Sequence, residues 1–315
     1  MTGSVACFEW AHIAPLAIPR MGFDAGKHRR PALALDLCAC IAVRCGIIFF
    51  CSQMHSDGAR KTVTPRRSKQ LFLTICLAIA GAIGIASKAD TPMTAAEYNA
   101  QPQQMLDAYR HVEAASVSDA IEQLFHQKRY MSHRMQAIFP TKFAGTAVTV
   151  LLKPEENHDP NALTGMLQAI DSGGSGSVYV MTVEGGADIA GMGGLMGTAM
   201  SARGYAGAVV DGGVRDIPQL KRVQFPVYAL GPVPSTSVGH YRFAGANIPI
   251  VCDGIQVEPG DIIVADQDGV VVVPKAHAAD ILIKAQALDN SEHSMYPFIE
   301  KYRSIVEAVQ KFGRI

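Results

Sequence analysis

The sequence predicts a layered α/β fold for residues 90–315, and two observations carry this prediction. From Ala144 to Arg222, β-branched segments alternate with segments whose apolar residues have helical spacing. Such alternation is typical of a sheet covered by helices. Past Phe225 the chain changes to short apolar runs separated by Pro and Gly turns, which indicates β-rich structure. Because there is no internal repeat and no second linker, we expect one domain.

The first expected elements are mostly helical. Residues 91–109 are polar and are expected to form a helical lead-in that Pro102 interrupts. Apolar residues in the segment 116–125 recur at intervals of three and four, which predicts an amphipathic helix with Ser116 as its N-cap. The following segments are expected to form a strand at 144–152, a helix at 161–172 and a buried strand at 176–183.

The second half begins with a glycine-rich turn. The expected elements are this turn at 184–194, a helix at 195–204, a strand at 207–211, a loop at 212–216 and a helix from Ile217. They continue with strands within 226–231, 248–257 and 258–274, and a terminal helix at 276–288. The residues Asp266 to Gly269 resemble the start of a calcium loop, but valines stand where later ligands would be, so we predict a hairpin turn.

The overall composition excludes two classes of protein. The chain has 28 basic and 28 acidic residues, so it lacks the global positive field on which non-specific nucleic-acid binding depends. A hydrophobic content of 49% is too high for a disordered chain. We therefore expect a folded protein with no nucleic-acid partner.

The segment 66–89 has the layout of a secretory signal peptide. A basic cluster precedes an apolar run from Leu71 to Ala86, and small residues end at Ala89. Because the run is shorter than the roughly 20 residues that a membrane span needs, cleavage after Ala89 is favoured over an uncleaved anchor. We therefore assign residues 54–89 to a signal peptide. The mature protein is expected to be exported, in the periplasm, with no stable membrane span.

Residues 1–53 precede the start that we expect at Met54. They hold the single tryptophan and five of the 7 cysteines, and no periodicity persists in them. The spacing of these cysteines fits no zinc pattern. We interpret the segment as an over-extended start rather than native folded protein. Only Cys252 follows residue 89, so the exported domain would be held together by its core rather than by a disulfide.

Two loops carry the candidate site, and the first is "GMGGLM" at 191–196. Its glycines would let the backbone N–H groups of Gly193, Gly194, Leu195 and Met196 face outward at a helix N-terminus, where the partial positive charge favours an anion. The alternative is a tight turn in which glycine only permits close packing. A dinucleotide site is not predicted, because Met196 replaces the last glycine of that fingerprint.

The second loop is "DGGVRD" at 211–216. Arg215 can bind a carboxylate through two parallel hydrogen bonds, and Asp216 can hold a hard divalent cation. The alternative is structural, with Asp216 as an N-cap, Gln219 completing a capping box and Arg215 merely solvated. Loops after successive strands converge on one crevice of an α/β sheet, and this convergence favours the functional interpretation.

These motifs resemble those of a known family. The segment "GGLMGTAMSARGYAGAVVDGGVRD" is similar to the signature of the RraA-like proteins, which include 4-hydroxy-4-methyl-2-oxoglutarate aldolases. "SVSDAI" at 116–121 resembles the opening helix of the family and "GDIIVADQDGVVVVP" at 260–274 its closing segment. The resemblance covers about residues 116–288. It implies a layered β/β/α fold of the swivelling type, a ring-shaped homotrimer or hexamer, and a site near subunit interfaces.

The resemblance also implies an activity and roles for residues. It implies a class II-type aldolase that uses Mg²⁺ or Mn²⁺ to cleave a small 2-oxo acid to pyruvate, with oxaloacetate decarboxylation as a side activity. The backbone from Gly193 to Met196 and the side chain of Arg215 would bind the substrate, and Asp216 would support the metal. A metal that stabilises the enolate would make a Schiff-base lysine unnecessary.

One position departs from the family pattern. Family aldolases carry an acidic residue twenty-one positions before the arginine, where this chain has Gly194. Glu184 or Asp188 in the same loop could take its place, or both could be ordinary solvated acids. Members that are not aldolases, such as the inhibitor of RNase E, also lack parts of the pattern. The alternative function is therefore a non-catalytic RraA-like trimer that binds a protein or a metabolite.

Overall fold

The computed structural model describes residues 92–313, which belong to one compact unit. The segments 1–53 and 54–89, interpreted above as an over-extended start and a signal peptide, lie outside the described residues. Among the helices of residues 92–313, none combines the length and the apolar character that a membrane crossing requires.

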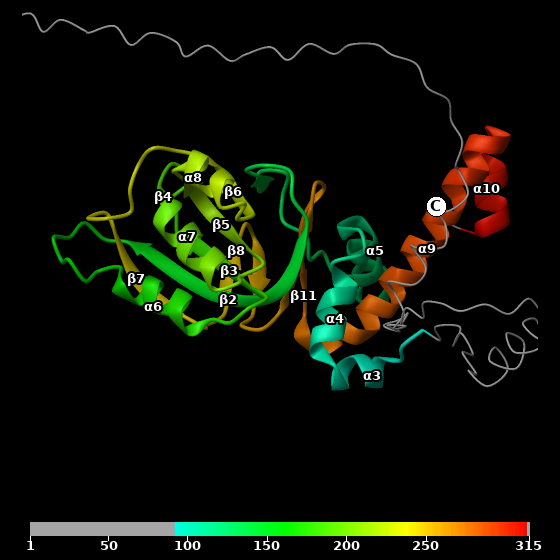
Figure 1. Cartoon of the computed structure of the whole chain (residues 1–315), viewed down its shortest axis with the longest axis horizontal. Coiled ribbons are helices and arrows are strands. Elements are labelled where there is room, and N and C mark those ends of the chain that lie inside the picture. Colours follow the sequence, from blue (N-terminus) through cyan, green and yellow to red (C-terminus); the bar gives the residue numbers. More distant parts are fainter. Residues whose placement is uncertain (1–91, 314–315) are drawn as a thin grey trace, which may run out of the picture. The chain divides into compact units, whose positions relative to one another are not determined.

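A nine-stranded sheet organises this unit (Figure 1). Its order is β1-β6-β5-β3-β2-β10-β11, with β4 paired to β5 and β7 paired to β2. The parallel strands are β2 (Phe143–Pro154), β3 (Ser177–Val183), β4 (Ala190–Met192), β5 (Gly207–Val214) and β6 (Val227–Pro232). The antiparallel additions are β1 (Gln136–Ala137), β7 (Tyr241–Ala246), β10 (Ile262–Asp266) and β11 (Gly269–Val273). Parallel neighbours need crossover connections, which here are helices.

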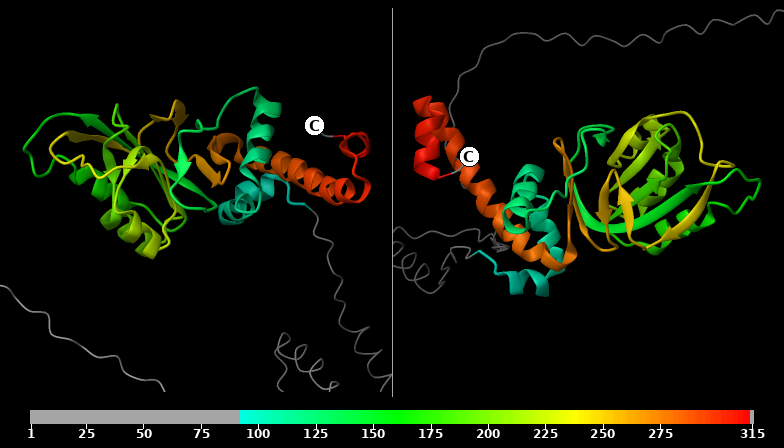
Figure 2. Two further views of the ribbon diagram at one scale, coloured as in Figure 1. Left: turned by 90° about the horizontal axis from the view of Figure 1, so that it is seen from above. Right: turned by 180° about the vertical axis from the view of Figure 1, so that it is seen from behind.

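Those crossover helices and a small hairpin cover opposite faces of the sheet (Figure 2). The helices are α6 (Thr164–Ser172), α7 (Gly194–Ala202) and α8 (Ile217–Arg222), and the hairpin is formed by β8 (Ile250–Cys252) and β9 (Ile255–Val257). Because side chains alternate along a strand, Met181 of β3 packs into the core under the helices, whereas Val180 packs into the core under the hairpin. The predicted β/β/α layering is therefore observed.

A third core joins further helices to the β10–β11 end of the sheet. These helices are α3 (Ala95–Ala100), α4 (Pro102–Tyr109), α5 (Ala114–Phe125) and α9 (Ala278–Tyr302), which begins after the 3₁₀ turn Lys275–His277. Pro102 interrupts the helical lead-in as predicted, because it occupies the first turn of α4, where a missing N–H is tolerated. The Tyr109 hydroxyl donates a hydrogen bond to the carbonyl of Ala278 at 2.6 Å and so links α4 to α9.

The predicted N-cap of α5 is wrong. The helix begins at Ala114, so Ser116 lies inside it, and the N-cap residue Glu113 makes no side-chain cap bond. Instead the buried carboxylate of Asp266 accepts a hydrogen bond from the Ala114 N–H at 2.7 Å. Asp266 belongs to the β10–β11 turn, where it pairs with Gly269, so the predicted hairpin turn is confirmed. A cap from so distant a residue leaves no local sequence signal.

The glycines of "DGGVRD" do not form the predicted loop, because β5 continues to Val214. A Cβ at Gly213 would lie 2.0 Å from Cγ1 of Val233, and one at Gly212 would lie 2.8 Å from Cγ2 of Val183. Glycine is therefore needed for packing within the strand. Asp211 is also inside β5, where its Oδ2 accepts a hydrogen bond from the Asp253 N–H at 2.7 Å and burial raises the pKa of its carboxyl group.

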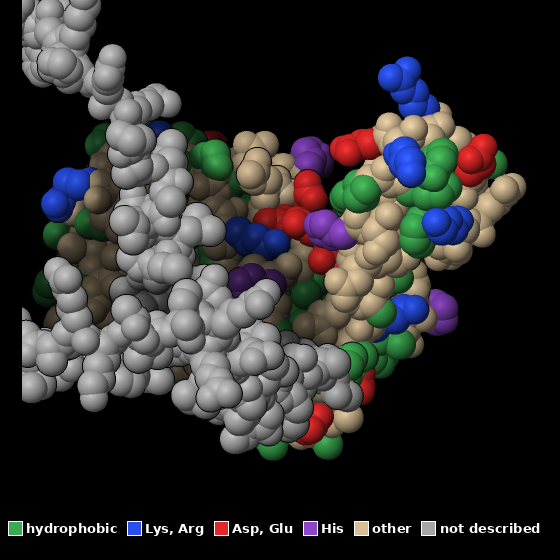
Figure 3. All heavy atoms as spheres, turned by 45° about the vertical axis from the view of Figure 1, so that its right-hand side comes forward, with side chains coloured by type: hydrophobic (Ala, Val, Ile, Leu, Met, Phe, Trp, Pro, Cys, Tyr) green, Lys and Arg blue, Asp and Glu red, His purple; other side chains and the backbone are tan. Residues whose placement is uncertain are grey.

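The C-terminal helix is longer than predicted. α9 runs to Tyr302 through Pro297, and a further helix, α10 (Ile305–Phe312), packs on it. Among the apolar side chains of these two helices, Tyr302, Ile305 and Val306 are exposed. Figure 3 shows apolar side chains lying among charged ones on this part of the surface. The predicted end at 288 marks the point after which α9 no longer packs on the sheet core, so its sheet-facing apolar spacing stops there.

Candidate functional site

A pocket of about 170 Å³ lies at the C-terminal end of β5, beside the N-terminus of α7. The two predicted loops meet there, because Gly193, Leu195, Met196, Arg215 and Asp216 all line it. Gly194 lies next to the pocket and lines an adjacent shallow depression together with Leu195 and Asp216. The structure thus brings the predicted site residues together, while their roles in binding stay predictions.

Asp216 reaches across to the other loop rather than capping its own helix. It precedes α8 with left-handed backbone angles, φ 59° and ψ 39°, and makes no side-chain cap bond to α8. Its Oδ2 accepts a hydrogen bond from the Gly194 N–H at 2.9 Å, at the first residue of α7. The alternative capping box is absent, since the Gln219 side chain donates to the Thr198 hydroxyl at 2.8 Å. Asp216 therefore ties together the two walls of the pocket.

Nη1 of the Arg215 guanidinium is hydrogen-bonded, and Nη2 has no hydrogen bond to a described residue. Its Nη1 donates a hydrogen bond to the Ser235 carbonyl at 3.1 Å, and its Nε lies 3.9 Å from Oδ2 of Asp216. The side chains of Arg215 and Asp216 are 44% and 51% exposed, so both can be reached by a ligand. An ion pair this open and this long contributes little to stability. The ion pair with Asp216 therefore does not account for the position of the guanidinium.

The two glycines allow this close approach. A Cβ at Gly193 would lie 2.7 Å from Oδ2 of Asp216 and 3.0 Å from Cγ of Arg215. A Cβ at Gly194 would lie 2.8 Å from Cγ of Gln219 and 3.1 Å from Cβ of Asp216. Gly193, the N-cap of α7, has no side chain, and Asp216 accepts a bond only from the Gly194 N–H, so the next N–H groups of the first turn still favour an anion. The packing role and the anion-binding role of these glycines are thus compatible.

Glu184 and Asp188 do not fill the place of the acid that is absent at position 194. Both are exposed, and neither lines the pocket. The backbone carbonyls of Glu184 and Asp188 accept hydrogen bonds from the Tyr241 hydroxyl and from the Ser235 hydroxyl respectively. Asp216 is therefore the single carboxylate in the pocket lining.

That single carboxylate determines which metal the pocket suits. Within residues 92–313, no group of three or more His, Cys, Asp or Glu side chains could hold a metal ion. Catalytic zinc needs three protein ligands, so this pocket does not fit it. Mg²⁺ keeps several waters and binds through one or two carboxylates plus the substrate. Oδ1 of Asp216 has no hydrogen bond to any described residue and fits such an ion.

A third segment lines the pocket and was not predicted from the sequence. Thr236, Ser237 and Val238 line it from the loop between β6 and β7. Ser235 fixes this loop, because its hydroxyl accepts a hydrogen bond from the Ala190 N–H at 2.9 Å and donates to the Asp188 carbonyl at 2.8 Å. Its position in the chain could have indicated it, because this loop follows a parallel strand and lies at the same edge of the sheet as the other two loops.

We expect Gly194→Ala to destabilise the protein by about 1–3 kcal/mol, because its Cβ would overlap Gln219 and the backbone-fixed Cβ of Asp216. Urea denaturation measures the change in the free energy of unfolding. Gly174→Ala is the matched control, because a Cβ there meets nothing within 4 Å. Equal stability of the two variants would show that the loops do not need to approach so closely.

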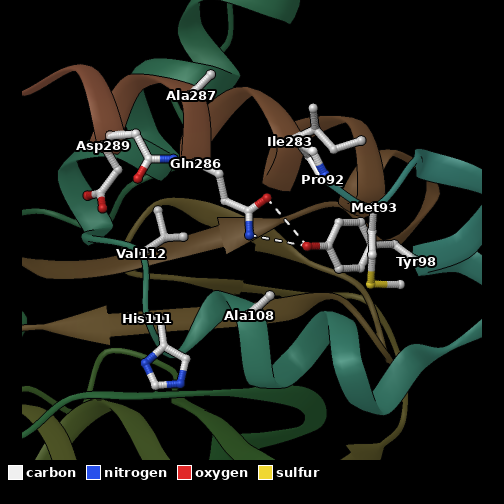
Figure 4. A pocket seen from close by; sticks show the side chains of 11 residues that line it. Pro92, Met93, Tyr98, Ala108, His111, Val112, Ile283, Gln286, Ala287 and Asp289 are labelled. Carbon is white, nitrogen blue, oxygen red and sulfur yellow. Dashed lines mark hydrogen bonds between the residues drawn. The ribbon is translucent and has the colours of Figure 1, made fainter. Parts of the chain in front are cut away.

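A second pocket, of about 710 Å³, lies between the N-terminal helices and α9 (Figure 4). Apolar side chains such as Met93, Val112 and Ile283 line much of it. The hydroxyl of Tyr98 and the amide of Gln286 are within hydrogen-bond distance of each other, with 3.2 Å between Nε2 and the hydroxyl oxygen. Asp289 accepts a hydrogen bond from the Glu113 N–H at 3.3 Å. The side chains of Tyr98, Gln286 and Asp289 thus bond to the protein itself, and none of the predicted site residues lies in this pocket.

Comparison with known sequences identifies relatives of this chain. A sequence model described as RraA-like, Aldolase/RraA, matches residues 114–272. A protein of Halalkalibacterium halodurans named "Putative 4-hydroxy-4-methyl-2-oxoglutarate aldolase" is 36% identical over 121 residues, covering 38% of this chain and 57% of that protein. A protein of the same name from Deinococcus radiodurans is 33% identical over 133 residues, covering 42% of this chain and 78% of that protein. The chain thus spans little more than half of the first relative.

Solved structures share the fold. An uncharacterized protein of Pseudomonas syringae superposes with a TM-score of 0.61 at 29% identity, covering 70% of this chain and 96% of that chain. RraAS2 of Streptomyces coelicolor, described as an unusual member of the RNase ES inhibitor RraA protein family, superposes with a TM-score of 0.55 at 25% identity, covering 64% of this chain and 96% of that chain. These similarities confirm the predicted fold class.

Proposed function

The chain belongs to the RraA-like family, and we propose that it is a divalent-metal-dependent lyase that cleaves a small 2-oxo acid to pyruvate. One observation carries the proposal: a guanidinium, a carboxylate and the N-terminus of a helix meet in a single pocket. This combination suits an anionic substrate that must be held while negative charge develops on it.

Each polar group of the pocket would have a separate role. Arg215 would bind the substrate carboxylate with the donors that the Ser235 carbonyl leaves free. The N–H groups at the start of α7 that Asp216 does not engage would orient the same anion. Asp216 would hold Mg²⁺ or Mn²⁺ through Oδ1, and such an ion supplies Lewis-acid stabilisation of an enolate. The hydrogen bond from the Gly194 N–H to Oδ2 would keep that carboxylate aimed at the pocket.

A second candidate is a non-catalytic protein that uses the same fold to bind a protein or a metabolite. Two observations favour it: Gly194 replaces the acid that the family resemblance implies for aldolases, and neither Glu184 nor Asp188 lines the pocket. A binding protein would still use Arg215 and the start of α7, but it would show no turnover.

An assay for pyruvate release distinguishes the two candidates. The purified protein is supplied with Mg²⁺ or Mn²⁺ and a panel of 4-hydroxy-2-oxo acids and oxaloacetate, and lactate dehydrogenase reports pyruvate. We expect turnover that chelation by EDTA removes and added metal restores. Ligand binding without turnover of any acid in the panel would reject the lyase and support the binding protein.

A further inference from the structure

The pocket also indicates which group the substrate has at the end away from its carboxylate. Resting on the proposed function, we infer that the preferred substrate is a 4-hydroxy-2-oxo monocarboxylate with an aliphatic or aromatic group on C4, rather than a dicarboxylate. The size of the pocket, the side chains at its mouth and the charges in its lining all favour such a substrate.

The size of the pocket fixes how much of the substrate lies inside. Its volume is about 170 Å³. A cavity of about 150 Å³ holds benzene, which has six non-hydrogen atoms. The pyruvyl part of a 2-oxo acid also has six, so this part alone accounts for the volume of the pocket beside Arg215. The substituent on C4 must then lie at the mouth of the pocket.

The mouth of the pocket is open and, apart from Arg215 and Asp216, mostly apolar. Three of its lining side chains are highly exposed: Leu195 is 90% exposed, Val238 66% and Leu167 47%. They come from α7, from the loop between β6 and β7 and from α6, so together they surround the entrance. Single exposed apolar residues need no explanation, but three around one entrance indicate an apolar ligand group.

The charges in the lining oppose a second carboxylate. Arg215 is the one cationic side chain that lines the pocket, and binding of the first carboxylate uses it. The inner wall is formed by the largely buried methionines Met166, Met192 and Met196, which pack well against hydrocarbon. A second carboxylate at this mouth would lie against apolar side chains without gaining a second cation, which selects against it.

The reaction balances for such a substrate. The C3–C4 bond breaks, and its electron pair goes to C3 to give the enolate of pyruvate. The C4 hydroxyl loses its proton and becomes the carbonyl of an apolar aldehyde or ketone. C3 then gains one proton, so no oxidant or further reactant is needed.

Binding measurements test the preference without depending on turnover. Calorimetry with Mg²⁺ present compares 2-oxopentanoate with 2-oxoglutarate, which have the same chain length but end in a methyl group and a carboxylate. We expect 2-oxopentanoate to bind at least roughly tenfold more tightly, and each added methylene to strengthen binding by about fourfold. Equal or tighter binding of 2-oxoglutarate would overturn the inference and leave the lyase proposal intact.

A charge introduced at the mouth gives a second test. Val238→Lys should weaken the binding of 2-oxopentanoate and strengthen the binding of 2-oxoglutarate. The dissociation constant of 2-oxoglutarate divided by that of 2-oxopentanoate should therefore fall by at least about tenfold. Val251→Lys is the matched control, because Val251 is 59% exposed and lies on β8, outside the pocket lining. The control should leave the ratio unchanged.

Two outcomes separate this inference from its alternatives. The affinity could depend on the group at the far end of the 2-oxo acid while the corresponding 4-hydroxy acids release no pyruvate. That result would support the ligand preference and reject the lyase. A change of molecular mass in Val238→Lys, measured by light scattering, with an unchanged ratio would show that the mouth contacts a second copy of the chain. That result would overturn the inference.

Discussion

Asp216→Ala is expected to lower kcat/KM for metal-dependent pyruvate release by at least roughly a thousandfold, because the Lewis acid that it would hold supplies several kcal/mol of stabilisation to the enolate. Asp216 is the single carboxylate in the pocket lining, so no neighbouring side chain can replace it. The loss should appear mainly in kcat, since the interaction strengthens as charge develops. Steady-state kinetics over a range of Mn²⁺ concentrations measures it.

Asp216→Asn separates the two functions of this side chain. The amide oxygen can still accept the hydrogen bond from the Gly194 N–H, which is 2.9 Å long in the wild type, but the negative charge is gone. We expect the stability of the wild type with little activity and weak Mn²⁺ binding by electron paramagnetic resonance. Normal Mn²⁺ binding and activity in either variant would remove Asp216 from the metal site.

The sequence predicts the layers of the fold because those layers depend on periodic burial. The strands at the centre are mostly apolar and deeply buried, as in β3, where every residue is buried. The positions that were mispredicted depend on contacts between distant segments. Asp266 caps α5 from 152 positions away, and the glycines of β5 are needed because Val183 and Val233 pack against them. No local pattern encodes such contacts.

The candidate site was predictable in part for a similar reason. Arg215 and the glycines of "GMGG" follow strands that end at one edge of the sheet, so their convergence could be deduced from topology. The hydrogen-bond partner of Asp216 was not predictable, because the local pattern offered a capping box as one alternative, whereas the folded chain directs the carboxylate to Gly194. The loop from Ser235 to Val238 carries no charged residue, so nothing in its chemistry singled it out.

Arg215→Ala is expected to lower kcat/KM by about a hundredfold or more, because each hydrogen bond from a guanidinium to a carboxylate contributes about 1.5–3 kcal/mol. The loss should appear mainly as a higher KM, since the carboxylate is bound equally in the ground state and the transition state. Arg215→Lys keeps the charge but not the two parallel donors, so it should recover only part of the loss. Stability should change little, because the side chain is 44% exposed.

Arg222→Ala is the matched control for this prediction. Arg222 is exposed, lies seven positions along the same segment in α8 and donates a hydrogen bond to the Gln219 side chain at 2.9 Å, but it does not line the pocket. Its removal should leave KM unchanged. If both arginine variants raised KM equally, the effect would come from the general positive charge of this surface. If neither did, the substrate carboxylate would bind through the start of α7 alone, and Arg215 would serve to hold the loop of Ser235 in place.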